Sequence, residues 1–237
     1  IIRESNPDIF ALQEIGSVDF LQELRTDLAR EDLHYTYAVH LSGPDPDRHI
    51  ALLSKVAPVE VVKHTNLSFK YLDRRERVKR GMLEVSYEDG SGDLFKLFLV
   101  HLKSKYAEDK EDPESRLRRT REAEACRNRI IERTFNLENY NFIILGDFND
   151  DPDTAALRRF YRRGDLQIGK RVPAQDSRGE VWTYFYKKQG QYSCIDGFVA
   201  SSEIFPQIVD RIGHVVDGED VLSGSDHRLV YLDLSFQ

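Results

Sequence analysis

The sequence predicts one domain of the mixed α/β or α+β class, arranged as a sandwich of sheets. Short runs with alternating or continuous apolar residues, which are typical of strands, outnumber the stretches with helical spacing. The helices are interspersed among groups of strands, whereas a regular βαβ repeat would place one after each strand. No internal repeat and no long linker divides the 237 residues, so we expect a single domain over residues 1–237.

The first half of the chain is expected to contain one helix among several strands. An apolar run at 9–12 predicts a strand that ends at Gln13 and Glu14. Apolar residues at helical spacing predict a helix over 18–29. The segment 42–47 is a turn-forming loop, and 88–92 has the chemistry of a hairpin turn. Further strands are expected at 35–39, 50–53, 59–62, 82–87 and 95–100.

The second half begins with a segment dense in charge, which predicts a solvated loop leading into a helix from 113 to 135. Pro113 is compatible with that start, since proline is tolerated in a first helical turn. We interpret Arg116, Arg119 and Arg121 first as a solvated face of this helix. The chain is completed by a strand at 142–145, a helix at 154–163 and strands at 182–186, 195–200 and 229–234.

Composition restricts the class of protein. Hydrophobic residues make up 40% of the chain, enough for a substantial core, and no run approaches the about 18–20 apolar residues of a membrane span. The net charge of −7 argues against binding of nucleic acid through the overall charge of the protein, although a local basic face is compatible with this net charge. Cys126 and Cys194 show neither a disulfide framework nor a zinc motif, so we expect free thiols.

Polar side chains that suit metal and phosphate chemistry stand at the ends of several predicted strands. They are Glu14, His101 and the pair Asp147 and Asn149. Polar groups beside a core are costly unless solvated or paired, so this placement favours a functional site. A carboxylate can bind Mg²⁺ through its hard oxygens, and an imidazole can bind or protonate a phosphoryl oxygen. Each residue also has a plain structural interpretation, as a surface carboxylate or a strand-end histidine bonded to a loop.

The loop after 142–145 invites two chemical interpretations. In one, Asp147 takes a proton from water and Asn149 donates a hydrogen bond to a non-bridging phosphoryl oxygen. In the other, the acidic spacing belongs to a calcium loop, which requires Gly at its sixth position and Glu at its twelfth. Those positions hold Pro152 and Arg158, so the calcium loop is excluded.

Three further polar residues lie near the C-terminus. Asp196 stands inside an apolar strand, where an aspartate needs a partner such as an imidazole, or a metal. Asp226 and His227 follow a Gly-Ser pair and precede the last strand. By themselves they are also compatible with a turn or helix-cap signature.

Taken together, residues 7–14, 100–105, 146–150, 192–199 and 224–227 resemble motifs of the endonuclease/exonuclease/phosphatase superfamily, with a likeness to its bacterial members. The resemblance implies a four-layer sandwich of two mostly antiparallel sheets flanked by helices. It implies that Asp196 pairs with His227, and that Glu14 and Asp226 hold Mg²⁺ or Mn²⁺. An activated water would then attack the phosphorus, and the implied catalytic residues are His101, Asp147, Asn149, Asp196 and His227.

The implied reaction is hydrolysis of a phosphoester, with a nuclease or other phosphodiesterase favoured. The alternatives are a small-molecule or lipid phosphoesterase of the inositol-phosphate or sphingomyelin type, and a non-catalytic binding module. Arg80 can direct a guanidinium towards a phosphate, or belong to an exposed charged edge. Trp182 and Tyr184 can stack on a base or sugar, or fill the core. We expect a monomer that binds a phosphoester substrate, with nucleic acid among the options.

The opening segment, residues 1–8, is interpreted as the end of a helix. Members of the superfamily normally begin with a strand that carries an Asn supporting the metal. We therefore expect that this strand precedes the present sequence, and that any targeting signal preceded it as well.

Overall fold

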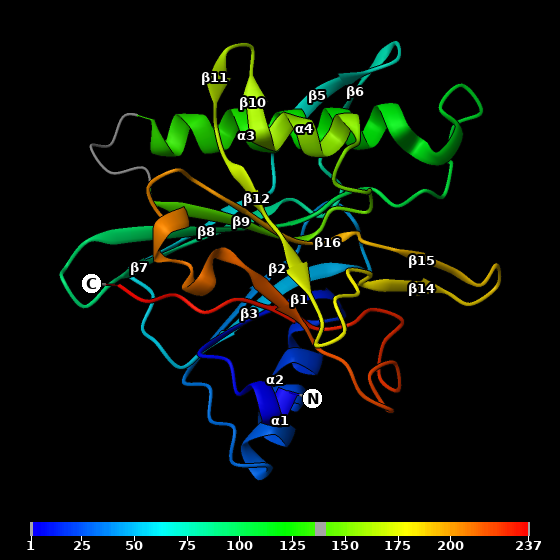
Figure 1. Ribbon diagram of the computed structural model, residues 1–237. Coiled ribbons are helices and arrows are strands. Elements are labelled where there is room, and N and C mark those ends of the chain that lie inside the picture. Colours follow the sequence, from blue (N-terminus) through cyan, green and yellow to red (C-terminus); the bar gives the residue numbers. More distant parts are fainter. Residues whose placement is uncertain (1, 136–140, 237) are drawn as a thin grey trace.

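Two β-sheet layers packed face to face form the middle of the molecule (Figure 1). The computed structural model describes residues 2–135 and 141–236. Neighbouring strands of the six-stranded sheet are antiparallel, except for the parallel pair β8 and β9. In order across the sheet these strands are β12 (Lys170–Val172), β16 (Asp196–Ala200), β9 (Phe142–Asp147), β8 (Leu94–His101), β7 (Met82–Glu88) and β4 (Glu60–His64).

The opposite layer consists of two three-stranded sheets. In the first, β3 (His49–Ser54) lies between β1 (Ile9–Ile15) and β2 (Tyr37–Leu41). In the second, β17 (Gly213–Val215) lies between β13 (Ala174–Gln175) and β18 (Val230–Tyr231). β1 packs on β9, and β18 packs on β16, which is the neighbour of β9 in the six-stranded sheet.

The main core between the layers is an apolar cluster contributed by both of them. It includes Leu52 of β3 from one layer, and Leu83, Val85 and Leu97 of β7 and β8 from the other. All four side chains are buried. Burial of these facing apolar surfaces, which is favourable by about 25 cal/mol per Å², holds the two layers together.

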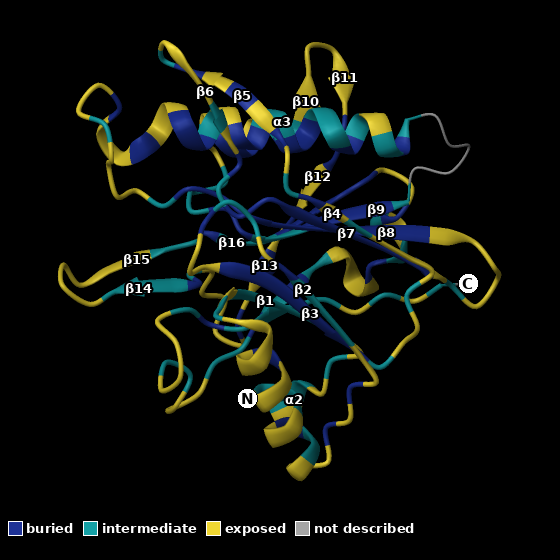
Figure 2. Ribbon diagram, turned by 180° about the vertical axis from the view of Figure 1, so that it is seen from behind, coloured by how far each residue is buried: buried dark blue, intermediate teal, exposed yellow. Residues whose placement is uncertain are grey.

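Helices cover the outer faces of both layers. α2 (Val18–Arg30) packs Leu21 and Leu28 against the outer face of β3, and the short α1 (Ile2–Ser5) lies beside it. On the other side, α3 (Arg116–Thr134) and α4 (Ala155–Tyr161) cover the six-stranded sheet. The strands are mostly buried, whereas the outward faces of the helices are exposed (Figure 2). The predicted four-layer sandwich is therefore confirmed.

Most predicted elements are present, with differences at their ends. The helix expected from 113 begins at Arg116, because Pro113–Ser115 forms a separate 3₁₀ turn. The strand expected at 229–234 is reduced to the two residues of β18, and the opening helix is described from Ile2, since Ile1 lies outside the described residues. The hairpins β5 (Ser68–Tyr71) with β6 (Arg74–Arg77) and β10 (Arg162–Arg163) with β11 (Leu166–Gln167) were not predicted.

The interpretation of Arg119 as part of a solvated helix face is wrong. Its side chain is 1% exposed, and its Nε donates to Asp150 Oδ2 at 2.9 Å. Its Nη1 donates to the carbonyls of Lys103 and Glu114. Three acceptors from three segments satisfy the guanidinium, which is how an arginine can be buried at tolerable cost. The expected free thiols at Cys126 and Cys194 are confirmed, and none of the described helices is both long and apolar enough to cross a membrane.

A buried charged cluster joins α3 to the six-stranded sheet away from the cleft described below. Glu84, which is fully buried, accepts hydrogen bonds from His64, Lys96 and Arg133. Burial raises the pKa of the Glu84 carboxyl, but these three hydrogen bonds outweigh it and lower the pKa to about 2. The carboxylate is therefore ionised and fully paired in the folded protein.

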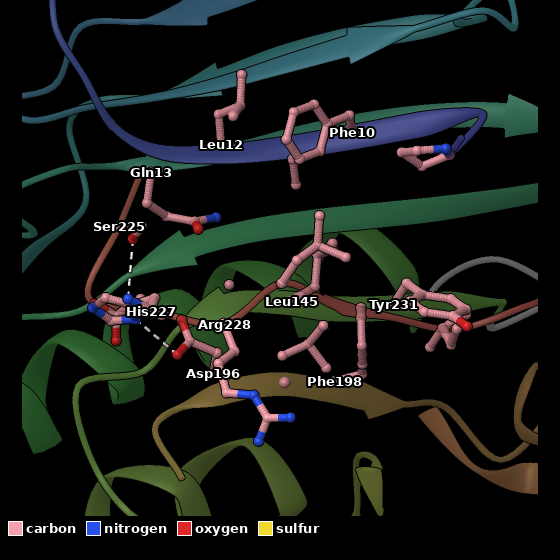
Figure 3. Close-up of a pocket in the computed structure, with 18 of the residues that line it drawn as sticks. Phe10, Leu12, Gln13, Leu145, Asp196, Phe198, Ser225, His227, Arg228 and Tyr231 are labelled. Carbon is pink, nitrogen blue, oxygen red and sulfur yellow. Dashed lines mark hydrogen bonds and ion pairs between the residues drawn. The ribbon is translucent and has the colours of Figure 1, made fainter. Parts of the chain in front are cut away.

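A large cleft separates the two parts of the second layer. Within the described residues β1 pairs with β3 alone and β18 with β17 alone, so each has one unpaired edge. Both strands line a cleft of about 1830 Å³, together with Leu145 and Phe198 of the six-stranded sheet (Figure 3). Every residue of β3 is buried, whereas those of β1 are only partly buried or exposed. The sandwich is open at this place.

Candidate active site

Three predicted residues meet at one edge of the six-stranded sheet. In the parallel register of β8 and β9, His101 lies opposite Asp147. In the antiparallel register of β9 and β16, Asp196 also lies opposite Asp147. Asp147 thus has an imidazole on one side and a carboxylate on the other. The end of the central strand, rather than proximity in sequence, brings these groups together.

The approach of β8 to β9 depends on Gly146. Its φ of +134° is a conformation that L side chains rarely adopt, and a Cβ there would lie 2.0 Å from the carbonyl oxygen of Val100. Asn149 then folds back at φ 52°, so that its backbone N–H and its side-chain amide each donate to a different oxygen of Asp147. Its amide also donates to the carbonyl of Leu102. Asn149 therefore orients the Asp147 carboxylate and ties β9 to the end of β8.

The implied pair of Asp196 and His227 is present in the structure. His227 Nδ1 donates to Asp196 Oδ2 at 2.8 Å (Figure 3). The hydroxyl of Thr183 donates to the same oxygen at 2.7 Å. Burial lowers the pKa of His227, but the hydrogen bond and charge of Asp196 outweigh it and raise the pKa to about 9. His227 is therefore held as an imidazolium in one orientation.

Asp147 and His101 are shifted towards their neutral forms. Burial and the adjacent charge of Asp196 raise the pKa of the Asp147 carboxyl. Burial, followed by the positive charges of Arg80 and His227, lowers the pKa of His101 to about 3. His101 is 1% exposed, and neither of its ring nitrogens has a hydrogen-bond partner among the described residues. Its Nε2 lies 3.4 Å from Oδ2 of Asp147 without forming a hydrogen bond. A buried imidazole without a hydrogen bond is costly, which indicates a site that a ligand completes.

Glu14 and Asp226 face the cleft from opposite walls. Glu14 has a φ of 55° where the pairing of β1 with β3 is irregular, and this turns its carboxylate towards His101, with 3.8 Å between Oε1 and Nε2. Arg48 Nε lies 3.5 Å from the same oxygen. Asp226 is exposed on the cleft, and its backbone carbonyl accepts from the N–H of Phe185. Two further carboxylates therefore stand on the cleft beside the buried group.

The donor set fits a hard divalent cation. Ligand atoms of Asp147, Asp196 and His227 lie within 4.8 Å of one another, and Glu14 and Asp226 add carboxylates on the same cleft. Carboxylate oxygens suit Mg²⁺ or Mn²⁺, and both cations commonly keep water and phosphate as further ligands. The unpartnered ring nitrogens of His101 supply a second observation that the site takes a further group.

Arg80 lies behind the site rather than on the cleft. It is 4% exposed, its Nε is 3.4 Å from Asp45 Oδ2, and its Nη1 donates to the Leu102 carbonyl at 3.5 Å. It is not among the residues that line the cleft. Its charge reaches the site through His101, whose pKa it lowers. Direct binding of substrate by Arg80 stays a prediction.

Sequence reasoning missed two supports of the site. Thr183 is 1% exposed and bonds Asp196, and a small hydroxyl between two aromatic residues gave no signal of this. Arg228 forms a buried ion pair with Asp176 at 2.9 Å and donates to the carbonyls of Val216 and Trp182. This arginine fixes the backbone directly after His227. Its position next to the Asp-His pair was the only hint in the sequence.

Comparison with solved structures shows proteins that share this fold. The chain is similar in fold to the human nocturnin catalytic domain with bound sulfate, at 17% identity over 100% of this chain and 83% of that chain, with a TM-score of 0.64. It is also similar to sphingomyelinase C from Streptomyces griseocarneus, at 16% identity over 96% and 83% with a TM-score of 0.63. A beta toxin mutant from Staphylococcus aureus with bound magnesium ions matches at 16% identity over 96% and 83%, with a TM-score of 0.64.

No curated protein sequence matches the chain. The sequence profile of the Endonuclease/Exonuclease/phosphatase family matches residues 1–227, which is nearly the whole chain and includes every predicted site residue. The members of this family are generally hydrolases of phosphoester bonds. The family match covers both the residues of the strand-end cluster and nearly all of the sandwich that positions them. The chain therefore belongs to the endonuclease/exonuclease/phosphatase family.

Proposed function

We propose that the protein is a phosphodiesterase that depends on Mg²⁺ or Mn²⁺ and acts on nucleic acid. The observation that carries the proposal is the arrangement of Asp147 between His101 and the Asp196–His227 pair, at one end of the six-stranded sheet. A carboxylate, a neutral imidazole and an imidazolium gathered around the ends of β8, β9 and β16 provide both proton transfer and stabilisation of phosphoryl charge. A non-catalytic module would have no need to hold these groups so closely.

Each residue has a role that follows from its contacts. The paired carboxyl groups of Asp147 and Asp196 take up the proton of the attacking water, the His227 imidazolium can give its Nε2 proton to the leaving oxygen, and Asn149 keeps Asp147 oriented. Because Asp196 fixes Nδ1 of His227, the Nε2 atom is left to face the phosphoryl oxygens. Glu14 and Asp226 would hold the cation, which when bound neutralises charge on the phosphoryl oxygens.

His101 supplies a neutral imidazole in this scheme. With its pKa lowered to about 3, it is uncharged at neutral pH and can donate one N–H to a phosphoryl oxygen. Arg80 would act from behind His101, because its positive charge keeps the imidazole neutral. Direct contact between Arg80 and the substrate is retained as an alternative. The lipid or small-molecule phosphoesterase remains the second candidate, since the nocturnin and sphingomyelinase structures share the same fold.

A substrate panel tests the function. Single-stranded and double-stranded DNA, RNA, nucleotides, sphingomyelin and inositol phosphates would each be incubated with Mg²⁺ or Mn²⁺, with Asp147→Asn as the near-isosteric control. We expect hydrolysis of nucleic acid that chelation abolishes without changing the melting temperature. Activity with Zn²⁺ but with neither Mg²⁺ nor Mn²⁺ would contradict the metal assignment. Binding without hydrolysis across the panel would favour the non-catalytic module.

We also propose that residues 1–237 form one monomeric domain. A further extended segment of the polypeptide would occupy the part of the cleft between β1 and β18. The unpaired edges of both strands and the partly buried Leu145 beneath them support this. Hydrogen exchange compared between this chain and a longer natural polypeptide tests it. The amides of β1 and β18 should exchange more slowly in the longer form, and equal exchange rates would count against the added strand. Light scattering tests the monomer.

A further inference from the structure

One hairpin projects from the active site and belongs to neither sheet layer. It consists of β14 (Tyr184–Tyr186) and β15 (Gln191–Ser193), and it extends away from the body of the molecule (Figure 1). Its register pairs Tyr184 with Ser193 and Tyr186 with Gln191, so these four side chains share one face. All four line the cleft. The hairpin therefore prolongs one wall of the active site outwards.

The aromatic residues of the hairpin differ in whether they are free to bind. Trp182, which precedes the hairpin by two residues, is engaged, because the guanidinium of Arg228 lies 4.2 Å from its ring centre and its Nε1 donates to Glu180. Tyr184 and Tyr186, by contrast, are partly exposed on the cleft, with ring centres 6.4 Å apart and planes inclined by 20°. The ring of Tyr184 is 4.8 Å from that of His227. Two nearly parallel rings thus lead outwards from the catalytic imidazole.

Positive charge follows the two tyrosines along the chain. Lys187 and Lys188 are exposed at the hairpin tip, and neither forms an ion pair or hydrogen bond with any described residue. Lys187 follows Tyr184 by three residues, roughly 10 Å in an extended chain. Elsewhere on the cleft, Lys105 and Tyr106 repeat the combination, and Tyr106 is 76% exposed.

We propose that this hairpin guides a single-stranded nucleic acid out of the active site. This rests on the proposed nuclease function and identifies how the substrate would be held. Tyr184 and Tyr186 stack on the bases next to the scissile phosphate, and Lys187 and Lys188 each contact a phosphate further along. Aromatic rings in series with basic groups are the recurring means of holding single strands, because every base has a π-face and every nucleotide a charge.

The hairpin tip argues against a lipid surface as the partner. Its sequence from 187 to 191 is Lys-Lys-Gln-Gly-Gln, which contains no apolar side chain. Segments that enter a bilayer interface bury Trp, Phe or Leu there. The tip is therefore suited to a polyanion in water, and membrane binding becomes an outcome that the experiment must be able to reveal.

Binding measured without hydrolysis tests the guide. A fluorescein-labelled thymidine oligonucleotide, and an abasic oligonucleotide of the same length, would be titrated with the full chain in chelator, with anisotropy as the readout. Tyr186→Ala should weaken binding of the thymidine oligonucleotide by roughly 5- to 160-fold, the range for loss of one stacked base. It should change binding of the abasic oligonucleotide little, and Tyr186→Phe should restore the difference between the two.

The lysines are tested by salt dependence. The double variant Lys187→Gln with Lys188→Gln should weaken both oligonucleotides equally and reduce the slope of log affinity against log salt by up to about 1.4, since each phosphate contact contributes about 0.7. The matched control changes Lys63 and Lys70, exposed residues of β4 and β5, to Gln and should leave the slope close to that of the parent chain.

The outcomes separate this inference from the proposed function. If both hairpin variants bind the oligonucleotides with the affinity of the parent chain, the guide is wrong even if the parent chain cleaves nucleic acid. If the hairpin variants instead lose binding to phosphatidylserine vesicles while retaining oligonucleotide affinity, the partner is a membrane and the guide is wrong. Absence of hydrolysis in the substrate panel, together with the expected binding changes, would reject the nuclease but keep the guide.

Discussion

Replacing His227 with alanine should separate catalysis from folding. The side chain is 28% exposed, and its Nδ1 makes one side-chain hydrogen bond, to Asp196. The substitution therefore removes a positioned acid–base group from the cleft and leaves the strands around it intact. We expect turnover to fall by about 10²- to 10⁴-fold, the usual effect of losing such a group, which corresponds to about 2.7–5.5 kcal/mol in the activation barrier.

The expected loss of stability is smaller. A hydrogen bond to a charged partner contributes about 1.5–3 kcal/mol, and partial exposure places His227 at the lower end of that range. Asp196 is not left unpaired, because the hydroxyl of Thr183 still donates to the same oxygen at 2.7 Å. A loss of at most about 2 kcal/mol lowers the melting temperature by roughly 4–8 °C in a chain of this length.

The assay compares His227→Ala with Asp226→Ala on one phosphoester. For each variant we would measure turnover at saturating Mg²⁺, the melting temperature and a Mg²⁺ titration by calorimetry. His227→Ala should lose turnover while keeping its affinity for Mg²⁺, whereas Asp226→Ala should bind Mg²⁺ more weakly and recover part of its turnover at high concentration. Near-normal turnover of His227→Ala would refute the acid–base role, and equal loss of metal affinity in both variants would make His227 a ligand.

Three further predictions concern stability and positioning. Glu84→Gln should lower the free energy of unfolding, measured with urea. In the parent chain the ionised Glu84 contributes about 3 kcal/mol, at 1.36 kcal/mol per pKa unit. This contribution should be complete above the ordinary pKa of 4.5 and should disappear as the pH falls through about 2. Gly146→Ala should lower both the melting temperature and turnover, because its Cβ would lie 2.0 Å from the Val100 oxygen; unchanged values would contradict the close approach. Thr183→Val should reduce turnover more than substrate affinity, since it removes one of the two side-chain donors to Asp196, and Thr183→Ser should restore the rate.

Local sequence patterns were sufficient for the elements that bury their own apolar faces. The continuous run before Asp147 and the helical spacing over 18–29 predicted β9 and α2, because strand and helix periods follow from backbone geometry alone. The hairpin of β5 and β6 was missed because it lacks such a continuous apolar pattern. It is rich in charge and buries only Phe69 and Tyr71, against α3, so its pattern carried little signal.

The sequence by itself determined the family of the chain and was enough to predict which residues would carry the chemistry, since a polar residue at the end of an apolar strand is visible without a structure. Only the tertiary structure decided how they meet. Strand register places His101 and Asp196 on either side of Asp147, and burial lowers the pKa of His101 while the partner of His227 raises its pKa. The same burial made Arg119 a structural tie instead of a solvated charge. Register and burial are properties of strands far apart in the chain, and no local pattern encodes them.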